Sequence, residues 1–330
     1  MGKYNYVLVK NASDYYRLNY SEIIGRDDVC YLDNFAVNFP FLLRIIHKLH
    51  NSQKLNRYIP LPFKSVWFPY YFKHRFTDSK PLCFIVDASP LYLTPYIFDY
   101  ILYLKKKYEK AKFVLFYQDM IKLCPDRFRP QCLKSLFNLI ITYDYIESVE
   151  YGILYHPTVG SYNFITPADD VPQSDVFLLA KAKNRLPLII QLYKFLTNHG
   201  IRCEFIILEA NVNQREYYSG IHYFERPLSY RKNLEYVQKT KCILELMQEG
   251  AVGYTLRLWE AILYDKKLLT NNKFIKSSHY YDPSYVSVIN IDSDLVVDID
   301  FLKTDMLYDN PHKLEITPSK FLNFIEEKLL

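Results

Sequence analysis

Short apolar runs of strand length alternate with longer segments of helical periodicity along most of the chain. In the first half the apolar runs are YNYVLVK, DVCYL, SVWF, LCFIVDAS, KFVLFYQD and NLIITYD, and the segments between them include PFLLRIIHKLH and PYIFDYILYLKKKYEK. The second of these segments ends in a basic turn, which suits the negative end of a helix dipole. Alternating strands and helices predict a parallel sheet covered by helices.

The alternation restarts after a loop rich in proline, glycine, aspartate and serine, PTVGSYNFITPADDVPQS (157–174). The later apolar runs are DVFLLAKA, RCEFIIL, KCILEL, KLLT and VSVINI, and the helical segment RLPLIIQLYKFLTNHG separates the first two. We therefore expect two α/β domains, residues 1–165 and 166–330. The amphipathic end, TPSKFLNFIEEKLL, predicts a helix that could cross back over both domains. Ligands of parallel sheets bind at the carboxyl ends of the strands, so the cleft between two such domains is the expected site.

The stretch ILELMQEGAVGYTLRLWEAILYDKKLLTNN (243–272) predicts a strand, a glycine-containing loop, a helix and a strand. The chain has only 8 glycines, and two of them, Gly250 and Gly253, lie in this loop. A strand that feeds a helix through such a loop presents free backbone N–H groups and the positive end of the helix dipole, which together hold phosphate. Glycine is needed where the backbone approaches the anion closely or takes a positive φ.

Three side chains of the helix that follows extend this hypothesis. Thr255 and the loop amides are expected on a phosphate, with Arg257 assisting and Glu260 accepting hydrogen bonds from a ribose. The alternative is an ordinary strand–helix turn in which Arg257 and Glu260, three residues apart, form a helical ion pair. The spacing of the residues fits both interpretations.

A second cluster of charge follows the first strand of the second domain. DVFLLAKAKNR places Lys181, Lys183 and Arg185 just past that strand, at the carboxyl edge expected for the glycine loop. Three cations beside a phosphate-binding helix suit a diphosphate. A solvated basic turn is the alternative, but two independent features at one edge favour the anion site.

These segments, SDVFLLAKAKNR, LSYRKNLEYVQKTKCILELMQEGAVGYTLRLWEAILYDKKLLTNN and YDPSYVSVI, resemble bacterial surface-polysaccharide glycosyltransferases of the GT-B fold. In that family a strand is followed by a Gln-x-Gly-x-Thr-x-Arg-x-x-Glu-Ala-like run and then by a Lys-Leu-(Leu/Ile)-Thr-(Thr/Asn)-Asn run. The resemblance covers most of the chain and is specific between Glu245 and Asn272. Where the family has a Gln-Gly pair, this chain has Gly250-Ala251-Val252-Gly253.

The resemblance implies two Rossmann-like domains whose parallel sheets face a central cleft. It implies a nucleotide diphosphate-sugar donor on the C-terminal domain and a surface-glycan or lipid-linked acceptor on the N-terminal one. Gly253, Thr255, Arg257 and Glu260 are the implied donor contacts, and Arg185 is the implied diphosphate partner. Enzymes of this fold usually stabilise the leaving diphosphate with a helix dipole and cations rather than with a metal, so no metal site and no bound cofactor are expected.

Glycosyl transfer also needs a base for the acceptor hydroxyl, which we expect at a strand end of the first domain. Asp87 in CFIVDAS is the first candidate, and Asp119 in FVLFYQD and Asp144 in IITYD are the others. Each of the three could instead cap a helix. No Asp-x-Asp triplet follows a strand directly, and the late triplets at 292–294 and 298–300 are interpreted as turn residues.

Charge and cysteine usage narrow the class of protein. The net charge of +5 is spread along the chain, which argues against a nucleic-acid binder with a concentrated basic stripe. The 6 cysteines form no Cys-x-x-Cys pair, which indicates free thiols in a reducing cytoplasm. No apolar run reaches the length of a signal peptide core or a membrane-spanning helix, so a cytoplasmic protein, with contact to the inner membrane surface as an option, is expected.

The run NFPFLLRIIHKLHNSQKLNRYIPLPFKSVWF (38–68) mixes apolar, aromatic and basic residues. It fits either an interfacial helix that brings the enzyme to lipid-linked acceptors or a core helix with a basic outer face, and the core helix is the preferred interpretation.

The function expected from the whole chain is therefore a glycosyltransferase. The alternatives are a sugar-phosphate or polyol-phosphate transferase and a non-catalytic subunit that assists a partner glycosyltransferase; a homodimer is a further option.

Overall fold

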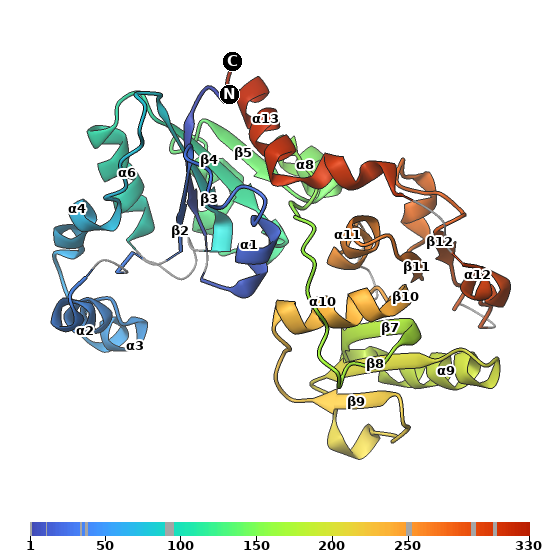
Figure 1. Cartoon of the computed structure of the whole chain (residues 1–330). Helices are drawn as coiled ribbons and strands as arrows, with labels where there is room; N and C mark the ends of the chain where they lie inside the picture. The colour runs from blue at the N-terminus through green and yellow to red at the C-terminus, as the bar shows by residue number, and fades with distance from the viewer. Residues whose placement is uncertain are drawn as a thin grey trace. The chain divides into compact units, whose positions relative to one another are not determined.

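The computed structural model describes residues 2–10, 12–33, 35–36, 39–89, 96–248, 253–291, 295–305 and 309–330. The chain divides into two compact units, coloured from blue to green and from green to orange in Figure 1, with the red C-terminal helix returning to the first. Unit 1 consists of Met1–Pro157 and Pro318–Leu330, and unit 2 of Thr158–Thr317. Residues 158–165, which we expected in the first domain, therefore belong to unit 2.

The described residues of unit 1 form a sheet of six parallel strands in the order β2-β1-β3-β4-β5-β6. The order reverses between β1 and β3, because β2 lies on one side of β1 and the later strands lie on the other. Alternate side chains such as Val7, Phe84 and Leu115 are buried in the core. The strands are β1 (Asn5–Val9), β2 (Val29–Leu32), β3 (Leu82–Asp87), β4 (Lys112–Tyr117), β5 (Leu139–Thr142) and β6 (Leu154–Tyr155).

The helices of unit 1 include one from the far end of the chain. That helix, α13, buries Phe321 and Ile325 against the unit, and the Phe321 ring lies 4.8 Å from the ring of Phe116 in β4. Tyr6 Oη and Lys3 N both donate to the Glu326 carboxylate, so α13 is tied to β1. The helices are α1 (Asp14–Asn19), α2 (Phe41–His50), α3 (Gln53–Tyr58), α4 (Phe68–Tyr71), α6 (Ile97–Lys107), α7 (Pro130–Leu133), α8 (Tyr145–Tyr151) and α13 (Pro318–Lys328).

Two expectations for unit 1 are wrong. SVWF is not a strand: Lys64–Trp67 is a turn of 3₁₀-helix that leads into α4, and a four-residue apolar run does not distinguish these structures. The preferred core helix in residues 38–68 is not found either, because α2 has no buried side chain.

The described residues of unit 2 form a second sheet of six parallel strands, in the order β12-β11-β10-β7-β8-β9. Here the order reverses between β7 and β10: the chain builds outward through β8 and β9 on one side and through β11 and β12 on the other. The strands are β7 (Ser174–Lys181), β8 (Cys203–Leu208), β9 (Ile221–Phe224), β10 (Thr240–Glu245), β11 (Lys267–Thr270) and β12 (Val286–Val288).

The helices of unit 2 cover this sheet, and the longest of them, α9, ends before Gly200, whose φ of 78° suits a helix stop. The helices are α9 (Leu186–Asn198), α10 (Tyr230–Lys239), α11 (Leu256–Leu263) and α12 (Ile299–Lys303). The expected α/β architecture, with a parallel sheet in each half of the chain, is confirmed. In the part of the chain that the structure describes, no helix is long and apolar enough to cross a membrane.

Candidate functional site

The carboxyl ends of β7 and β10 bring the two predicted features of unit 2 together. These strands are parallel neighbours at the point where the strand order reverses, which we call the switch point of the unit. Arg185, after β7, donates from Nη1 to the carbonyl oxygen of Leu246, after β10. Lys183 Nζ donates to Gln248 Oε1 at 2.8 Å. Ligands of open parallel sheets bind outside such a switch point, so this edge is the candidate site.

Arg185 is a half-buried cation bound to carbonyl oxygens. Besides Leu246, its guanidinium donates from Nη2 to the carbonyl of Lys181 at 2.6 Å. Among the described residues it makes no ion pair, and its buried Nε has no hydrogen-bond partner. Burial lowers the pKa of the Arg185 guanidinium, because removing a charge from water without an opposite charge nearby costs free energy. The switch point therefore holds positive charge that no carboxylate in the described chain neutralises.

The other two predicted cations differ from each other. Lys181 forms an ion pair with Glu209 at 2.6 Å, and both side chains are half exposed. Lys183 donates its hydrogen bond to the amide oxygen of Gln248, and its backbone has a φ of 43°, a left-handed conformation that costs a non-glycine residue free energy. Lys183 and Arg185 thus remain the anion-binding candidates of this cluster, whereas Lys181 already has a partner.

The predicted glycine loop leads into the N-terminus of α11. Gly253 has a φ of 92°, which an L side chain rarely adopts, and its carbonyl accepts a bond from Asn272 Nδ2 at 2.7 Å. Thr255 caps α11, since its Oγ1 accepts a bond from Arg257 N at 3.1 Å. Gly250, the other predicted glycine, lies outside the described residues. The expected turn into the helix is therefore present at Gly253 and Thr255.

A buried carboxylate that we did not predict lies beneath this loop. Glu245 ends β10, and its two oxygens accept bonds from the hydroxyls of Thr255 and Thr270, the second at 2.5 Å. Burial raises the pKa of Glu245, and the two hydroxyls and Arg257 act in the opposite direction. Its position in the sequence, an acid at the end of an apolar strand next to a glycine loop, is the signal that could have identified it.

Arg257 and Glu260 form an ion pair, but a buried one. Glu260 is 0% exposed; its Oε2 accepts from Arg257 Nη1, and its Oε1 accepts from Asn233 Nδ2 at 2.7 Å. Asn233 Oδ1 in turn accepts from Arg257 Nη1 at 3.0 Å. Burial raises the pKa of Glu260 and Arg257 opposes this. Because Glu260 is fully buried, a ribose hydroxyl could reach it only if the side chains around it moved. In this arrangement Glu260 and Asn233 hold the guanidinium in place.

The switch point of unit 1 contains the first candidate base. Asp87 ends β3 and is 1% exposed; its Oδ2 lies 3.8 Å from Nζ of Lys10, which follows β1. Asp87 Oδ1 accepts from Tyr16 Oη at 3.2 Å and from Ser89 N at 2.8 Å. Burial raises the pKa of Asp87 and lowers that of Lys10 to about 8, while each charge stabilises the other. The Asp87 carboxylate is therefore buried inside the unit and not accessible to solvent.

The other two candidate bases lie at the same edge of unit 1. Asp144 caps α8, where its Oδ1 accepts from Glu147 N at 2.9 Å, so the helix-cap alternative applies to it. Asp119, two residues past β4, has an exposed side chain, and partial loss of surrounding water raises its pKa. Of the three carboxylates, Asp119 is the one that solvent reaches. Of the late triplets, Asp298 caps α12, and residues 292–294 lie outside the described chain.

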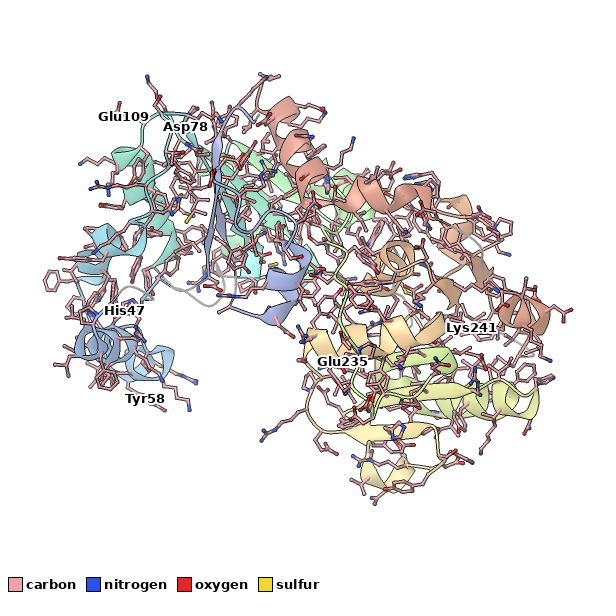
Figure 2. The ribbon with its side chains drawn as sticks, in the orientation of Figure 1. His47, Tyr58, Asp78, Glu109, Glu235 and Lys241 are labelled. Carbon is pink, nitrogen blue, oxygen red and sulfur yellow. The ribbon has the colours of Figure 1, made fainter. Side chains whose placement is uncertain are left out.

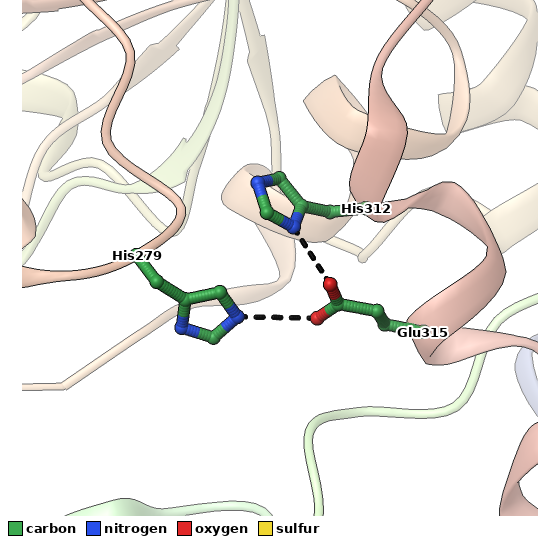
Figure 3. Close-up of side chains that lie close together, drawn as sticks. All are labelled: His279, His312 and Glu315. Atoms are coloured by element: carbon green, nitrogen blue, oxygen red, sulfur yellow. Dashed lines mark hydrogen bonds and ion pairs between the residues drawn. The ribbon is translucent and has the colours of Figure 1, made fainter.

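A separate cluster in unit 2 has side chains that can bind metal (Figure 3). His279 Nε2 and His312 Nδ1 lie 3.1 and 2.8 Å from the two oxygens of Glu315. In the described part of the chain these are the one group of three such residues whose ligand atoms lie within 4.8 Å of one another. Partial burial acts to raise the pKa of Glu315, but the imidazole hydrogen bonds outweigh it and lower that pKa. The carboxylate therefore has a partner on each oxygen without an ion.

Comparison with known proteins gives similarity at the level of structure alone. No protein-family profile and no curated protein matches the sequence. A solved trehalose-6-phosphate synthase from Burkholderia multivorans is similar with a TM-score of 0.48 and 8% identity, over 99% of this chain and 96% of that one. TarM is similar with a TM-score of 0.38 and 11% identity over 76% of this chain, which spans 51% of TarM. A chain of the glycosylation-associated protein complex Gap123 from Streptococcus agalactiae is similar with a TM-score of 0.41 and 10% identity, over 84% of this chain and 57% of that one. With every TM-score below 0.5, none of these similarities assigns an activity.

Proposed function

We propose that this chain is a glycosyltransferase that takes a sugar from a nucleotide-sugar donor and transfers it to a surface-glycan or lipid-linked acceptor. The observation that carries the proposal is Arg185, a half-buried guanidinium at a sheet switch point, bound to carbonyl oxygens and without a carboxylate partner in the described chain. A dianionic diphosphate would supply the missing negative charge. The resemblance of residues 245–272 to GT-B donor sites supports the same ligand.

In this proposal the diphosphate lies between the two features of the switch point. Lys183 and Arg185 contact it from the end of β7, and the N-terminal amides of α11 contact it from the end of β10. The Thr255 hydroxyl, which we also expected on the phosphate, donates its proton to Glu245 instead. Arg257 is oriented toward this task by Glu260 and Asn233. These groups favour the negative charge that grows on the diphosphate as the sugar–phosphate bond breaks, which is how they would lower the barrier to transfer.

The acceptor hydroxyl has to lose a proton, and Asp119 is the base that we propose. Its side chain is exposed, whereas Asp87 is buried with Lys10 and Asp144 caps a helix. A carboxylate whose pKa is raised by partial desolvation is a stronger base than one fully in water. Asp119→Asn should therefore abolish sugar transfer but leave nucleotide binding intact; unchanged transfer would assign the base elsewhere.

Nucleotide binding is tested by a thermal-shift screen against UDP, GDP, CDP, TDP and ADP, with and without EDTA. Saturating ligand at about 100 times its dissociation constant adds about 2.7 kcal/mol of stability, enough to resolve. We expect the nucleotide with one particular nucleobase to give a selective shift that persists in EDTA, because cationic side chains and backbone amides neutralise the charge of the diphosphate without a metal ion. A shift that EDTA abolishes would indicate metal-dependent binding.

The matched variants are Arg185→Gln and Arg202→Gln. Both remove one positive charge, but Arg202 pairs with Asp175 at 3.0 Å at the opposite end of β7. Arg185→Gln should weaken nucleotide binding about 10- to 100-fold, the range for a lost charged hydrogen bond, whereas Arg202→Gln should not change it. Equal affinities in the two variants would remove the basis of the proposal.

A second candidate is a non-catalytic subunit that binds nucleotide and assists a partner glycosyltransferase. The burial of Asp87, our first candidate base, favours it. Turnover separates the two: an enzyme releases free nucleotide from its sugar donor in the presence of acceptor, and a non-catalytic subunit binds the nucleotide without releasing it.

A further inference from the structure

The helix α2 of unit 1 exposes the side of itself that a soluble protein would normally bury. Phe41 and Leu42 are 74% and 71% exposed, and no residue of the helix is buried. At 100° per residue, Phe41, Leu42, Ile45, Ile46 and Leu49 fall on one continuous stripe. Every side chain of this stripe is exposed.

The opposite side of α2 has two histidines that bond to its own unit. His47, labelled in Figure 2, lies with its Nε2 2.8 Å from the hydroxyl of Tyr71 in α4. His50 Nδ1 accepts a hydrogen bond from Trp67 Nε1 at 2.7 Å. The two imidazoles therefore fix the helix to the unit with its apolar stripe facing outward. The orientation of α2 is stabilised by specific hydrogen bonds.

The apolar surface continues beyond α2 into α3 and the turn before α4. Tyr58, which is labelled in Figure 2, lies at the end of α3 and is 82% exposed. Twelve of the twenty-six large apolar side chains that are exposed in the described chain lie within residues 41–70. Exposed apolar residues are therefore much denser in this segment than in the rest of the described chain. We call them the apolar face: Phe41, Leu42, Leu43, Ile45, Ile46, Leu49, Leu55, Tyr58, Ile59, Phe63, Val66 and Tyr70.

The charged residues in the stretch of sequence that contains the apolar face have one sign. Between Asp33 and Asp78 the sequence has no Asp or Glu. The same interval contains seven cations, among them Arg44 and Lys48, which lie one turn apart beside the stripe of α2: Arg44, Lys48, Lys54, Arg57, Lys64, Lys73 and Arg75. Elsewhere the chain mixes both signs, so the apolar face combines exposed hydrocarbon with a stretch of sequence whose charged residues are all Lys or Arg.

We propose that the apolar face docks this protein on an anionic lipid bilayer. A helix lying in the membrane interface inserts aliphatic and aromatic side chains among the acyl chains and keeps its cations at the level of the headgroups. Negative headgroups complement the seven cations, and the acid-free interval prevents repulsion from the same surface. The proposal does not depend on the activity proposed above, although a membrane-bound enzyme would meet a lipid-linked acceptor directly.

The test is flotation of the purified full chain with vesicles of phosphatidylcholine containing phosphatidylglycerol, against vesicles of phosphatidylcholine alone. We expect binding to the anionic vesicles that weakens with added salt. Leu42→Ser/Ile46→Ser should abolish it. The control Leu102→Ser/Val149→Ser changes two exposed apolar residues of α6 and α8 and should bind as the native chain does.

A second pair of variants tests the charge. Arg44→Gln/Lys48→Gln should lower vesicle affinity roughly 25-fold, the product of about 5-fold for each cation at an anionic surface. Lys106→Gln/Lys110→Gln removes two exposed lysines outside the face and should have no such effect.

Three outcomes would overturn the proposal. The first is a native chain that does not float with anionic vesicles, and the second is an α2 variant that floats as the native chain does. The third is a native dimer in lipid-free solution that Leu42→Ser/Ile46→Ser converts to monomer while vesicles are ignored, which would assign the face to a second copy of the chain. Because the assay measures no sugar transfer, its failure leaves the proposed glycosyltransferase function standing.

Discussion

Each unit builds a sheet of six parallel strands, but the buried carboxylates near the two switch points have different kinds of partner. In unit 1, Asp87 and Lys10 meet between β1 and β3 and neutralise each other in the interior. In unit 2, the buried carboxylate of Glu245 is held by the hydroxyls of Thr255 and Thr270, between β10 and β11. Glu245 makes its bonds to these hydroxyls, and Arg185 makes its bonds to the carbonyl oxygens of Leu246 and Lys181.

The difference shows that the position of a switch point in a sheet is not enough to make an anion site. Both edges offer strand ends and the following loops, but only the edge of unit 2 has a guanidinium without a carboxylate partner in the described chain. At the edge of unit 1 the buried cation is Lys10. It pairs with Asp87, and its Nζ donates a hydrogen bond to the hydroxyl of Tyr20 at 3.0 Å.

The largest effect is expected from breaking the pair in unit 1. Asp87→Ala leaves Lys10 buried without its counter-charge and should lower the free energy of unfolding by about 3–5 kcal/mol. The measurement is urea unfolding in a Trp259→Phe background, where Trp67 is the remaining tryptophan and reports on unit 1.

The double variant Lys10→Met/Asp87→Ala is its control. Replacing both charges should cost less than Asp87→Ala alone, because no uncompensated charge stays buried. Additive losses would mean that the two groups do not interact, and the contrast between the switch points would fail.

Acid should destabilise unit 1 through His156. This residue is buried among the rings of Phe321, Phe324 and Phe116, and burial lowers its pKa to about 4. Below the ordinary pKa of about 6.5, the unfolded chain binds a proton that the folded unit does not. Stability is therefore fully present above pH 6.5 and falls by about 3 kcal/mol as the pH drops to 4.

The measurement repeats the urea titration of unit 1 at several pH values. His156→Gln should remove most of this particular decline, since glutamine does not titrate. Parallel pH profiles for the native and variant chains would contradict the assignment of the effect to His156.

The smallest effect is expected at the hydroxyl-held carboxylate of unit 2. Thr255→Ala removes the cap of α11 and one donor to Glu245, so it should cost about 2 kcal/mol. Ser229→Ala removes the cap of α10, whose hydroxyl accepts from Lys232 N at 3.1 Å, and should cost about 1 kcal/mol. Urea unfolding in a Trp67→Phe background reports both through Trp259. If the two variants cost the same, Thr255 adds nothing to the stabilisation of Glu245.

Sequence periodicity predicted the architecture well, because strands such as Leu82–Asp87 and helices such as Leu186–Asn198 have patterns long enough to be distinct. It also predicted that the cations after β7 and the loop after β10 share an edge, since parallel strands align their carboxyl ends. It could not predict partners. Which cation pairs with a carboxylate of the described residues, as Lys181 does and Arg185 does not, depends on side chains far apart in the sequence.

The orientation of α2 is the clearest example of what pattern alone misses. An amphipathic helix normally turns its apolar stripe inward, and that expectation favoured a core helix. The stripe faces outward because His47 and His50 are bonded to Tyr71 and Trp67 on the inner side, which no periodicity reveals.

The return of α13 to unit 1 has a consequence for how the protein is made. Phe321 and Ile325 complete the core of unit 1, and Glu326 binds the hydroxyl of Tyr6 in its second-outermost strand. During synthesis, residues 1–157 leave the ribosome first, yet they lack this helix until residues 318–330 have emerged. Unit 2 is contained within 158–317 and has all of its own strands before that moment. The half of the protein that is translated first is therefore the half that finishes folding last, and until then it exposes a gap over β1 and β4 to the chaperones of the cell.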